Sequence, residues 1–408
     1  MAAARRRDPA RTSRLTLRGG VTLLVGAAAL ASAYILGWPE LVILGCFAVA
    51  LPLLAALFVL SFRPRWTVSR SSASVVVPLG STAVLRASFV AGTGRRPAGV
   101  WQDRLPWPPG VTEESPLRLP RGGSTASLSY RITPPRRGIF EVGPLLVAVA
   151  DPFGLTRRDL PLGPVQRLVV TPEAVPLAAD VLALAPEGGS AHRFHQHAVV
   201  GDDDLMTRAY RPGDALRRVH WRSSARQGEL MVRENELPNN AEALIVLDTR
   251  GSGYPDASRN RRPDGVESES FEWALRMTAS LTEHLTNAGV PARVIETAPP
   301  QLPPLSRHAE FREGLAAIRL SFAGEGLSWL SQLDYRSPAG TVLFAIAAGL
   351  DDATARRLAE LGPSCDRAVA FLVDATDSVA ERLGRAGWSC IPVHPDTPIA
   401  TAWQALDG

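Results

Sequence analysis

The residues best suited to chemistry lie close together in the segment 208–233, near the middle of the chain. Within it, Asp214 and His220 could form an acid–base pair, and Ser223 or Ser224 could act as a nucleophile. All four belong to one short predicted helix and its cap, whereas the members of a catalytic triad usually come from separate elements. A helix cap and a charged helix face explain these residues better than catalysis does, so we predict no catalytic residue.

The same segment has the pattern of a turn, a helix and a short strand. Pro212-Gly213 favours a turn, Asp214 suits the N-cap, residues 215–226 can form a helix, and Gly228 ends it. A strand from Glu229 to Arg233 should follow. The simplest role for this segment is structural, in which it joins two soluble domains.

Three histidines upstream have a spacing that could supply metal ligands: His192, His195 and His197. No Cys or further His stands nearby in the sequence, so solvated loop histidines are the better interpretation. The three cysteines of the chain lack the paired spacing of a metal site, and no disulfide framework is expected.

The charge of the chain does not indicate a nucleic-acid partner. Its net charge is +4, and all 44 basic residues are Arg, with no Lys. This uniformity is typical of a compositional bias in the genome, which converts solvated Lys to Arg without any demand for bidentate contacts. We therefore expect no nucleic-acid partner.

Two apolar runs near the N-terminus predict a transmembrane helical hairpin at 19–62. Neither Gly19–Trp38 nor Leu41–Phe62 contains a charged residue, and each approaches the roughly 20 residues that span a bilayer. Arginines precede the first run and follow the second, but none lies in the connecting turn, so both ends should be cytoplasmic. We expect a two-helix anchor in the cell membrane, with a basic N-terminus at 1–18 and cytoplasmic soluble domains.

Two alternative interpretations of the apolar runs fit less well. A cleaved signal peptide would be shorter, would carry a small-residue cleavage site and would not be followed at once by a second span. Core helices of a soluble protein would have a polar face, which both runs lack. The lipid bilayer is therefore the first predicted partner.

Residues 65–175 have the pattern of an antiparallel β-sandwich. Short β-rich runs are separated by Pro and Gly, and no long amphipathic helix interrupts them. The predicted strands are Ser74–Val77, Thr82–Val90, Ser124–Ile132, Gly138–Val142, Leu145–Ala150 and Arg167–Val170.

The remainder of the chain follows a different pattern. Residues 176–204 are rich in Ala, Pro and Gly and indicate a linker, and 205–240 hold the polar segment described above. From 241 to 408, apolar strands alternate with helical stretches, which predicts a mostly parallel sheet covered on both faces. A doubly wound α/β domain is the expected fold, with any ligand at the carboxyl ends of its strands.

The polar segment resembles bacterial and archaeal proteins that contain domain of unknown function 58. The resemblance rests on Tyr210-Arg211-Pro212-Gly213-Asp214, Arg218-Val219-His220-Trp221, Ser224-Ala225-Arg226 and the exit from Gly228 to Arg233. Two upstream pieces also match: Arg137-Gly138-Ile139-Phe140 leading to Gly143-Pro144, and Asp151-Pro152-Phe153-Gly154-Leu155. The family commonly has Asp immediately before the motif Trp, where this chain has His220.

The resemblance implies a membrane-anchored protein whose C-terminal part is similar to a von Willebrand factor A domain. Members are often encoded near MoxR-type AAA ATPases and transglutaminase-like membrane proteins, and no enzymatic activity is established for the family. The resemblance therefore implies a role in interaction or assembly, with such an ATPase as a candidate partner, and does not imply a reaction.

A metal-dependent adhesion site in a von Willebrand-like domain needs Asp-x-Ser-x-Ser after the first strand. The matching stretch is Asp248-Thr249-Arg250-Gly251-Ser252, in which Arg250 replaces a ligand serine by a permanent cation. The predicted strand Thr341–Ala347 also lacks an acid directly after it. We expect no metal or other cofactor. Two interpretations of Arg250 stay open: its guanidinium pairs with Asp248 in place of an ion, or it is a loop arginine in solvent.

Three functions follow from these observations. The first is a non-enzymatic, membrane-anchored scaffold that binds a protein partner in envelope-related processes. The second is a metal-dependent adhesion module or enzyme. The third is a sensor of an anionic ligand, which would use Arg217, Arg218, Arg222 and Arg226.

Overall fold

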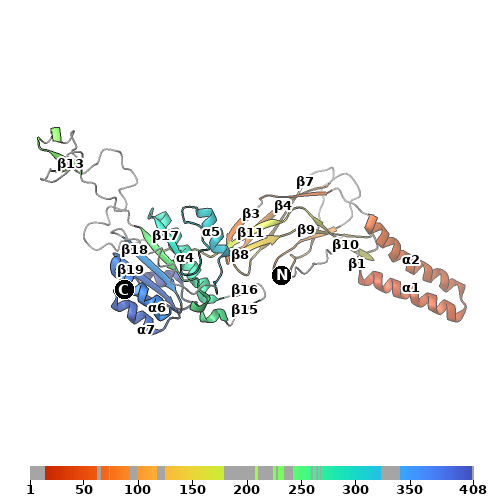
Figure 1. The fold of residues 1–408 in the computed structure, drawn as a ribbon. Coiled ribbons are helices and arrows are strands. Elements are labelled where there is room, and N and C mark those ends of the chain that lie inside the picture. Colours follow the sequence, from red (N-terminus) through yellow and green to blue (C-terminus); the bar gives the residue numbers. More distant parts are fainter. Residues whose placement is uncertain are drawn as a thin grey trace. The chain divides into compact units, whose positions relative to one another are not determined.

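The computed structural model describes most of the chain, in two compact units, Met1–Thr171 and Pro172–Gly408. The described residues are 14–61, 66–72, 74–91, 99–116, 125–178, 207–209, 224–226, 228–233, 242–258, 261–262, 265–266, 268–322 and 341–406. Figure 1 shows the helices and strands of each unit.

The first unit begins with a helical hairpin made of α1 (Leu17–Leu36) and α2 (Pro39–Ser61). The side chain of Thr16 caps α1, and Gly37 ends it in the left-handed conformation, with φ at 71° and its N–H bonded to the carbonyl of Ala33. Both helices are long and apolar enough to cross a membrane. They confirm the predicted pair of apolar helices.

Small residues let the two helices approach closely. A Cβ at Gly26 would lie 2.8 Å from Cγ2 of Val49, and a Cβ at Gly45 would lie 2.6 Å from Cγ of Leu30. Close backbone approach at glycines is typical of helix pairs in membranes, where hydrophobic burial between helices gives no driving force. The packing therefore suits a pair that is stable in lipid.

The rest of this unit consists of three sheets. The first contains β1 (Arg14–Leu15), β10 (Thr156–Leu162), β9 (Leu145–Ala150), β5 (Gly99–Asp103) and β6 (Ser115–Pro116), in that order. The second contains β3 (Ser74–Pro78), β11 (Gln166–Thr171) and β8 (Gly138–Val142), and the third β2 (Trp66–Arg70), β4 (Ala83–Ala91) and β7 (Thr125–Ile132). Six of these strands match the six predicted runs.

The central strand β4 shows why the sheets pack face to face. Its alternate residues Ala83, Leu85, Ala87 and Phe89 are buried, as the two-residue period of a strand requires. Phe89 and Ala87 pack in a cluster with residues of β5 and β9, while Leu85 and Ala83 pack in a second cluster with residues of β8 and β11. These clusters form the core of the predicted β-sandwich.

The prediction of a purely antiparallel sandwich is wrong at one edge. Strand β11 pairs with β8 in antiparallel fashion but with β3 in parallel, with Val169 opposite Val76. The two strands of the parallel pair are far apart in the sequence, so a local pattern of alternation carries no information about their relative direction.

The second unit contains a five-stranded sheet in which every pairing is parallel. Its order is β17 (Ala292–Glu296), β14 (Ala243–Leu247), β18 (Val342–Ala347), β19 (Arg367–Val373) and β20 (Ser389–Val393). All residues of β14 are buried, which is typical of a strand covered on both faces. In chain order this is the 2-1-3-4-5 arrangement of doubly wound folds.

Helices cover both faces of the sheet. One core contains residues of α4 (Glu269–Asn287), α5 (His308–Ala317) and α8 (Ile399–Gln404), together with Ile245 of β14. The opposite core contains residues of α6 (Asp352–Leu361) and α7 (Asp377–Arg385), together with Leu244 and Val246. The prediction of a doubly wound α/β domain is confirmed.

The segment around the predicted linker is partly described. Residues 172–178 lie against the α/β unit: the N–H of Val175 donates to Oγ of Ser280 at 2.9 Å, and Nε1 of Trp403 donates to the carbonyl of Ala178 at 3.0 Å. The first residues of the predicted linker 176–204 thus pack on this unit. Further along, β12 (Thr207–Ala209) pairs with β13 (Met231–Arg233), and β13 is the end of the strand predicted at Glu229–Arg233.

Candidate functional site

The candidate site lies at the carboxyl ends of β14 and β18, which are neighbours in the sheet. The helix that follows β14, α4, packs on one face of the sheet, whereas the helix that follows β18, α6, packs on the other. The connections that leave these two neighbouring strands therefore run to opposite faces of the sheet. Doubly wound proteins bind ligands at such a topological switch point. Asp248 follows β14 here, and Asp351 caps α6 after β18.

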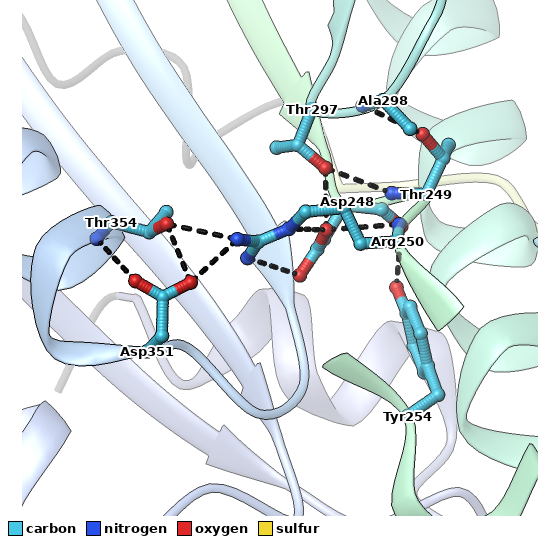
Figure 2. A network of polar contacts seen from close by, with 8 residues as sticks. All are labelled: Asp248, Thr249, Arg250, Tyr254, Thr297, Ala298, Asp351 and Thr354. Atoms are coloured by element: carbon cyan, nitrogen blue, oxygen red, sulfur yellow. Dashed lines mark hydrogen bonds and ion pairs between the residues drawn. The ribbon is translucent and has the colours of Figure 1, made fainter. Parts of the chain in front are cut away.

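An ion pair between Arg250 and Asp248 occupies the switch point (Figure 2). Nε of Arg250 donates to Oδ1 of Asp248 at 2.9 Å, and Nη2 donates to Oδ2 at 3.0 Å. The Asp248 side chain is 0% exposed and that of Arg250 is 9% exposed. Such a bidentate, buried arrangement is the strongest form of an Arg–carboxylate contact, and it confirms the predicted pairing.

The other edge of the guanidinium contacts the loop after β18. Nη1 of Arg250 donates to Oδ2 of Asp351 at 2.7 Å and to Oγ1 of Thr354 at 2.9 Å. Oδ1 of Asp351 accepts from the N–H of Thr354 at 2.8 Å, which is the N-cap bond of α6. The guanidinium therefore joins two strands of the sheet by bridging two carboxylates, as Figure 2 shows.

Neighbouring polar groups hold Asp248 in place. Oγ1 of Thr297, just after β17, donates to Oδ1 of Asp248, and the phenol of Tyr254 donates to the Asp248 carbonyl at 2.7 Å. Gly253 makes room for the carboxylate, because a Cβ there would lie 2.6 Å from Oδ2. The side chains of Thr297 and Arg250 thus hold the carboxylate, and that of Tyr254 holds its backbone, before any ligand arrives.

The electrostatics of the site favour a permanent ion pair. Burial alone lowers the pKa of Arg250, but the hydrogen bonds and charges of Asp248 and Asp351 outweigh it and raise that pKa above its ordinary value. Burial raises the pKa of Asp351, but the bonds from Thr354 and Arg250 outweigh this effect and lower it. Burial, followed by the charge of Asp248, raises the pKa of Tyr254. All three groups keep their ordinary charge at neutral pH.

The arrangement leaves little room for a metal ion at Asp248. A hard divalent cation needs several oxygen ligands at close range, and both carboxylate oxygens of Asp248 already accept N–H groups of Arg250. Ser252, the remaining residue of the degenerate metal pattern, is exposed on η5 (Gly251–Gly253). Among the described residues, no group of three His, Cys, Asp or Glu side chains could hold an ion.

Sequence reasoning missed Asp351, Thr354, Thr297 and Tyr254, which also belong to the network. No acid directly follows the strand that ends at Ala347, but the structure supplies one at Asp351, two residues beyond Gly349. A signal existed, because Asp351 and Thr354 have the spacing of an N-cap and its first-turn partner. Thr297 carries no comparable local signal.

Most predicted residues of the family motif lie outside the described residues. These are Tyr210, Arg211, Pro212, Gly213, Asp214, Arg218, His220 and Trp221, together with Arg217, Arg222, Ser223 and the histidines 192, 195 and 197. Residues 224–226 are helical, with Arg226 exposed. Gly228 has φ of +75°, and its N–H bonds to the carbonyl of Ser224 at 3.0 Å, as expected for a residue that ends a helix.

Comparison with solved structures gives only distant likenesses. A crystal structure of the CARDB domain of a protein from Pyrococcus furiosus, in complex with di-metal ions, has 16% identity over 24% of this chain and 94% of that domain, with a TM-score of 0.18. A solution structure of the same domain has 15% identity over 24% and 95%, with a TM-score of 0.18. The DNA-bound alkylpurine DNA glycosylase AlkC of Pseudomonas fluorescens has 14% identity over 38% and 48%, with a TM-score of 0.17.

These TM-scores are too low to support any argument about fold or function. No curated protein matches the chain. The family comparison is more specific and covers the polar segment together with β14 and all of α4. Residues 206–287 match the model described as Protein of unknown function DUF58, which supports the family resemblance drawn from the motif.

Proposed function

We propose that this chain is a non-enzymatic, membrane-anchored scaffold that binds a protein partner at the carboxyl edge of its α/β unit. In this proposal the unit acts as a von Willebrand factor A-like module, with the guanidinium of Arg250 standing permanently where such modules hold a metal ion. The observation that carries the proposal is the buried Arg250 bridge between Asp248 and Asp351. It fixes the loops of the switch point without an ion.

The surface around the bridge supports a protein contact. The side chain of Asp351 is 55% exposed although its Oδ2 accepts from Arg250. Phe322 is also exposed, and its ring lies so close to Gly251 that a Cβ on Gly251 would collide with it. Aromatic side chains, including Phe, are enriched at protein–protein interfaces, so an exposed ring packed against the loop that carries Arg250 suits a contact surface.

The partner we propose is a MoxR-type AAA ATPase in an envelope-related process, on the strength of the family resemblance. The hairpin of α1 and α2 would anchor the scaffold in the cell membrane, and the arginines flanking the two apolar runs favour a cytoplasmic position for both soluble units. A cytoplasmic position would give the α/β unit access to such an ATPase.

Reconstitution tests this proposal directly. The full chain in lipid nanodiscs is mixed with the purified MoxR-type ATPase of the same organism, and binding is measured with wild type, with Asp351→Asn/Phe322→Ala, and with the control Arg385→Ala. Arg385 pairs only with exposed Glu381 among the contacts described for it. We expect the double variant to lose at least tenfold in affinity while the control binds normally; no binding by wild type would overturn the choice of partner.

A metal titration separates the scaffold from the adhesion module. Thermal unfolding of the chain is recorded with Mg²⁺, Ca²⁺ and Mn²⁺ added after chelation, and we expect no stabilisation by any of them. Stabilisation that disappears in Asp248→Ala would overturn the assignment of Arg250 as the resident cation.

A further inference from the structure

The loop Asp151–Leu155 between β9 and β10 has a rigid backbone that the proposed function does not use. Its sequence is one of the upstream pieces that accompany the family motif. Asp151 is buried; its Oδ2 accepts from the N–H of Phe153 at 2.9 Å, and its Oδ1 accepts from the N–H and the hydroxyl of Thr156 at 2.5 and 3.0 Å. Gly154 turns the chain at φ of +68°. One carboxylate thus fixes the conformation of the whole loop.

This fixed loop displays a large apolar side chain. Phe153 is 63% exposed, although burial of a Phe side chain stabilises by roughly 1.5–3 kcal/mol. A single exposed apolar residue needs no explanation by itself. Phe153 differs from such residues because its loop is bonded to the apolar hairpin.

The loop is bonded to the start of α1. The N–H of Thr16, the residue that caps α1, donates to the carbonyl of Leu155 at 2.9 Å, and its hydroxyl donates to the carbonyl of Gly154 at 2.6 Å. A Cβ at Gly19, in the first turn of α1, would collide with the carbonyl of Leu155. The loop therefore lies at the level of the first turn of α1.

Two further contacts join the hairpin to the same edge of the sandwich. Strand β1, which leads directly into α1, pairs with β10, and Arg14 lies opposite Arg157. Nη1 of Arg158 lies 3.4 Å from the carbonyl of Leu60 near the end of α2, where the helix dipole favours a cation. Figure 1 shows β1 and β10 beside these ends of α1 and α2.

The apolar surface of the hairpin begins at the same level. Leu17, the first residue of α1, is 86% exposed, and the neighbouring Leu15 is also exposed. Arg14 and Arg18 are exposed beside them. Apolar side chains such as Phe and Leu bury into the boundary between headgroups and hydrocarbon in segments that lie on a membrane, and arginines near the surface attract anionic lipids.

We propose that Phe153 inserts into the interfacial layer of the bilayer and that Arg14 and Arg18 bind anionic lipid headgroups around it. The occupant of this surface is the membrane that α1 and α2 enter. The inference rests on the proposed membrane anchor and deepens it, because it holds the β9–β10 edge of the sandwich against the lipid surface.

Site-directed spin labelling tests the proposal in the full chain. Cys46, Cys365 and Cys390 are replaced by Ser, and single cysteines are placed at Phe153, at Leu44 of α2 and at Ile139 of β8. Leu44 and Ile139 are both exposed and serve as lipid and water controls. The protein is reconstituted in vesicles of phosphatidylcholine and phosphatidylglycerol, and label accessibility to oxygen and to a water-soluble nickel chelate is compared.

Each outcome has a distinct meaning. We expect labels at Leu44 and Phe153 to be shielded from nickel and accessible to oxygen, and the label at Ile139 to show the reverse. A shielded label at Leu44 with a water-exposed label at Phe153 would overturn the inference and leave the anchor intact. Nickel access at Leu44 would overturn the anchor itself.

In a second measurement the label is placed on the neighbouring residue, so that the side chain at position 153 can be varied. A label at the exposed Pro152 is compared in chains with Phe153 and with Phe153→Asp. We expect the Asp variant to raise nickel accessibility at this label severalfold, because a carboxylate does not bury in the apolar part of the interface and is repelled by anionic headgroups. Equal accessibility in both chains would show that the ring does not hold the loop in the membrane.

Discussion

Replacement of Arg250 by Ala should destabilise the α/β unit strongly. The substitution leaves the carboxylate of Asp248, which is 0% exposed, without its bidentate partner. Breaking a buried ion pair by removal of one partner costs about 3–5 kcal/mol, because an uncompensated charge stays buried. The lost bond to Asp351 adds little, since that side chain is half exposed and screened by solvent.

Hydrogen exchange of the full chain in detergent measures this cost locally. Where reclosing is faster than the chemical exchange step, about 3–5 kcal/mol corresponds to exchange that is faster by roughly two to four orders of magnitude. Peptides from β14 and β18 should show this acceleration, whereas peptides of the first unit should not. The control is Arg385→Ala, whose exposed pair with Glu381 should contribute about 0.3–0.5 kcal/mol.

A second variant isolates the buried charge as the cause. In Asp248→Asn/Arg250→Met the carboxylate and the guanidinium are both removed, so most of the lost stability should return. Acceleration below tenfold in Arg250→Ala would refute the reasoning, because it would mean that the Asp248 carboxylate finds another partner at little cost. Recovery of Arg250→Ala by a divalent cation would identify what that partner is.

Three further changes test other parts of the structure. Arg70→Ala should lower the stability of the first unit by about 3–5 kcal/mol in thermal unfolding, because Asp103, its bidentate partner, is 0% exposed. Gly45→Leu should separate α1 from α2 and lower the yield of engineered disulfides between them, since a Cβ already approaches Leu30 at 2.6 Å. Burial lowers the pKa of His284 below its ordinary 6.5, so the unfolded state binds more protons, and thermal stability should fall as pH drops through 6.5; His284→Phe should flatten this dependence.

The strands that the sequence predicted well show their own pattern, either alternation, as in β8, or a continuous apolar run, as in β9. Strands β8 and β9 were predicted at their observed bounds, Gly138–Val142 and Leu145–Ala150. Strand β10 (Thr156–Leu162) was missed, because Arg157, Arg158, Asp159 and Pro161 break the apolar pattern. It is a strand because it pairs with β9 as the second arm of a hairpin, with Arg157 opposite Ala150 and Leu162 opposite Leu145, a pairing that its own polar pattern does not indicate.

At the candidate site, one contact of Arg250 can be predicted from neighbouring residues in the sequence and the other cannot. The contact of Arg250 with Asp248 could be predicted, because the two residues are two positions apart after a buried strand. Asp351 is 101 positions from Arg250, and its role depends on which strand lies beside β14 in the sheet. A pattern of alternating strands and helices predicts a parallel sheet but not the order of its strands, and this order determines which loops meet at the switch point.

The bridge at Arg250 also changes which partner chemistry the site can use. A metal ion with an open coordination position binds an acidic group of its partner, as hard cations prefer carboxylate oxygen. Here the guanidinium donates four hydrogen bonds within the site, to Asp248, Asp351 and Thr354, and it can offer at most five N–H groups. The group that stays accessible is the carboxylate of Asp351, which is 55% exposed. An edge built in this way favours a basic residue on the partner, and its charge does not depend on the supply of divalent metal.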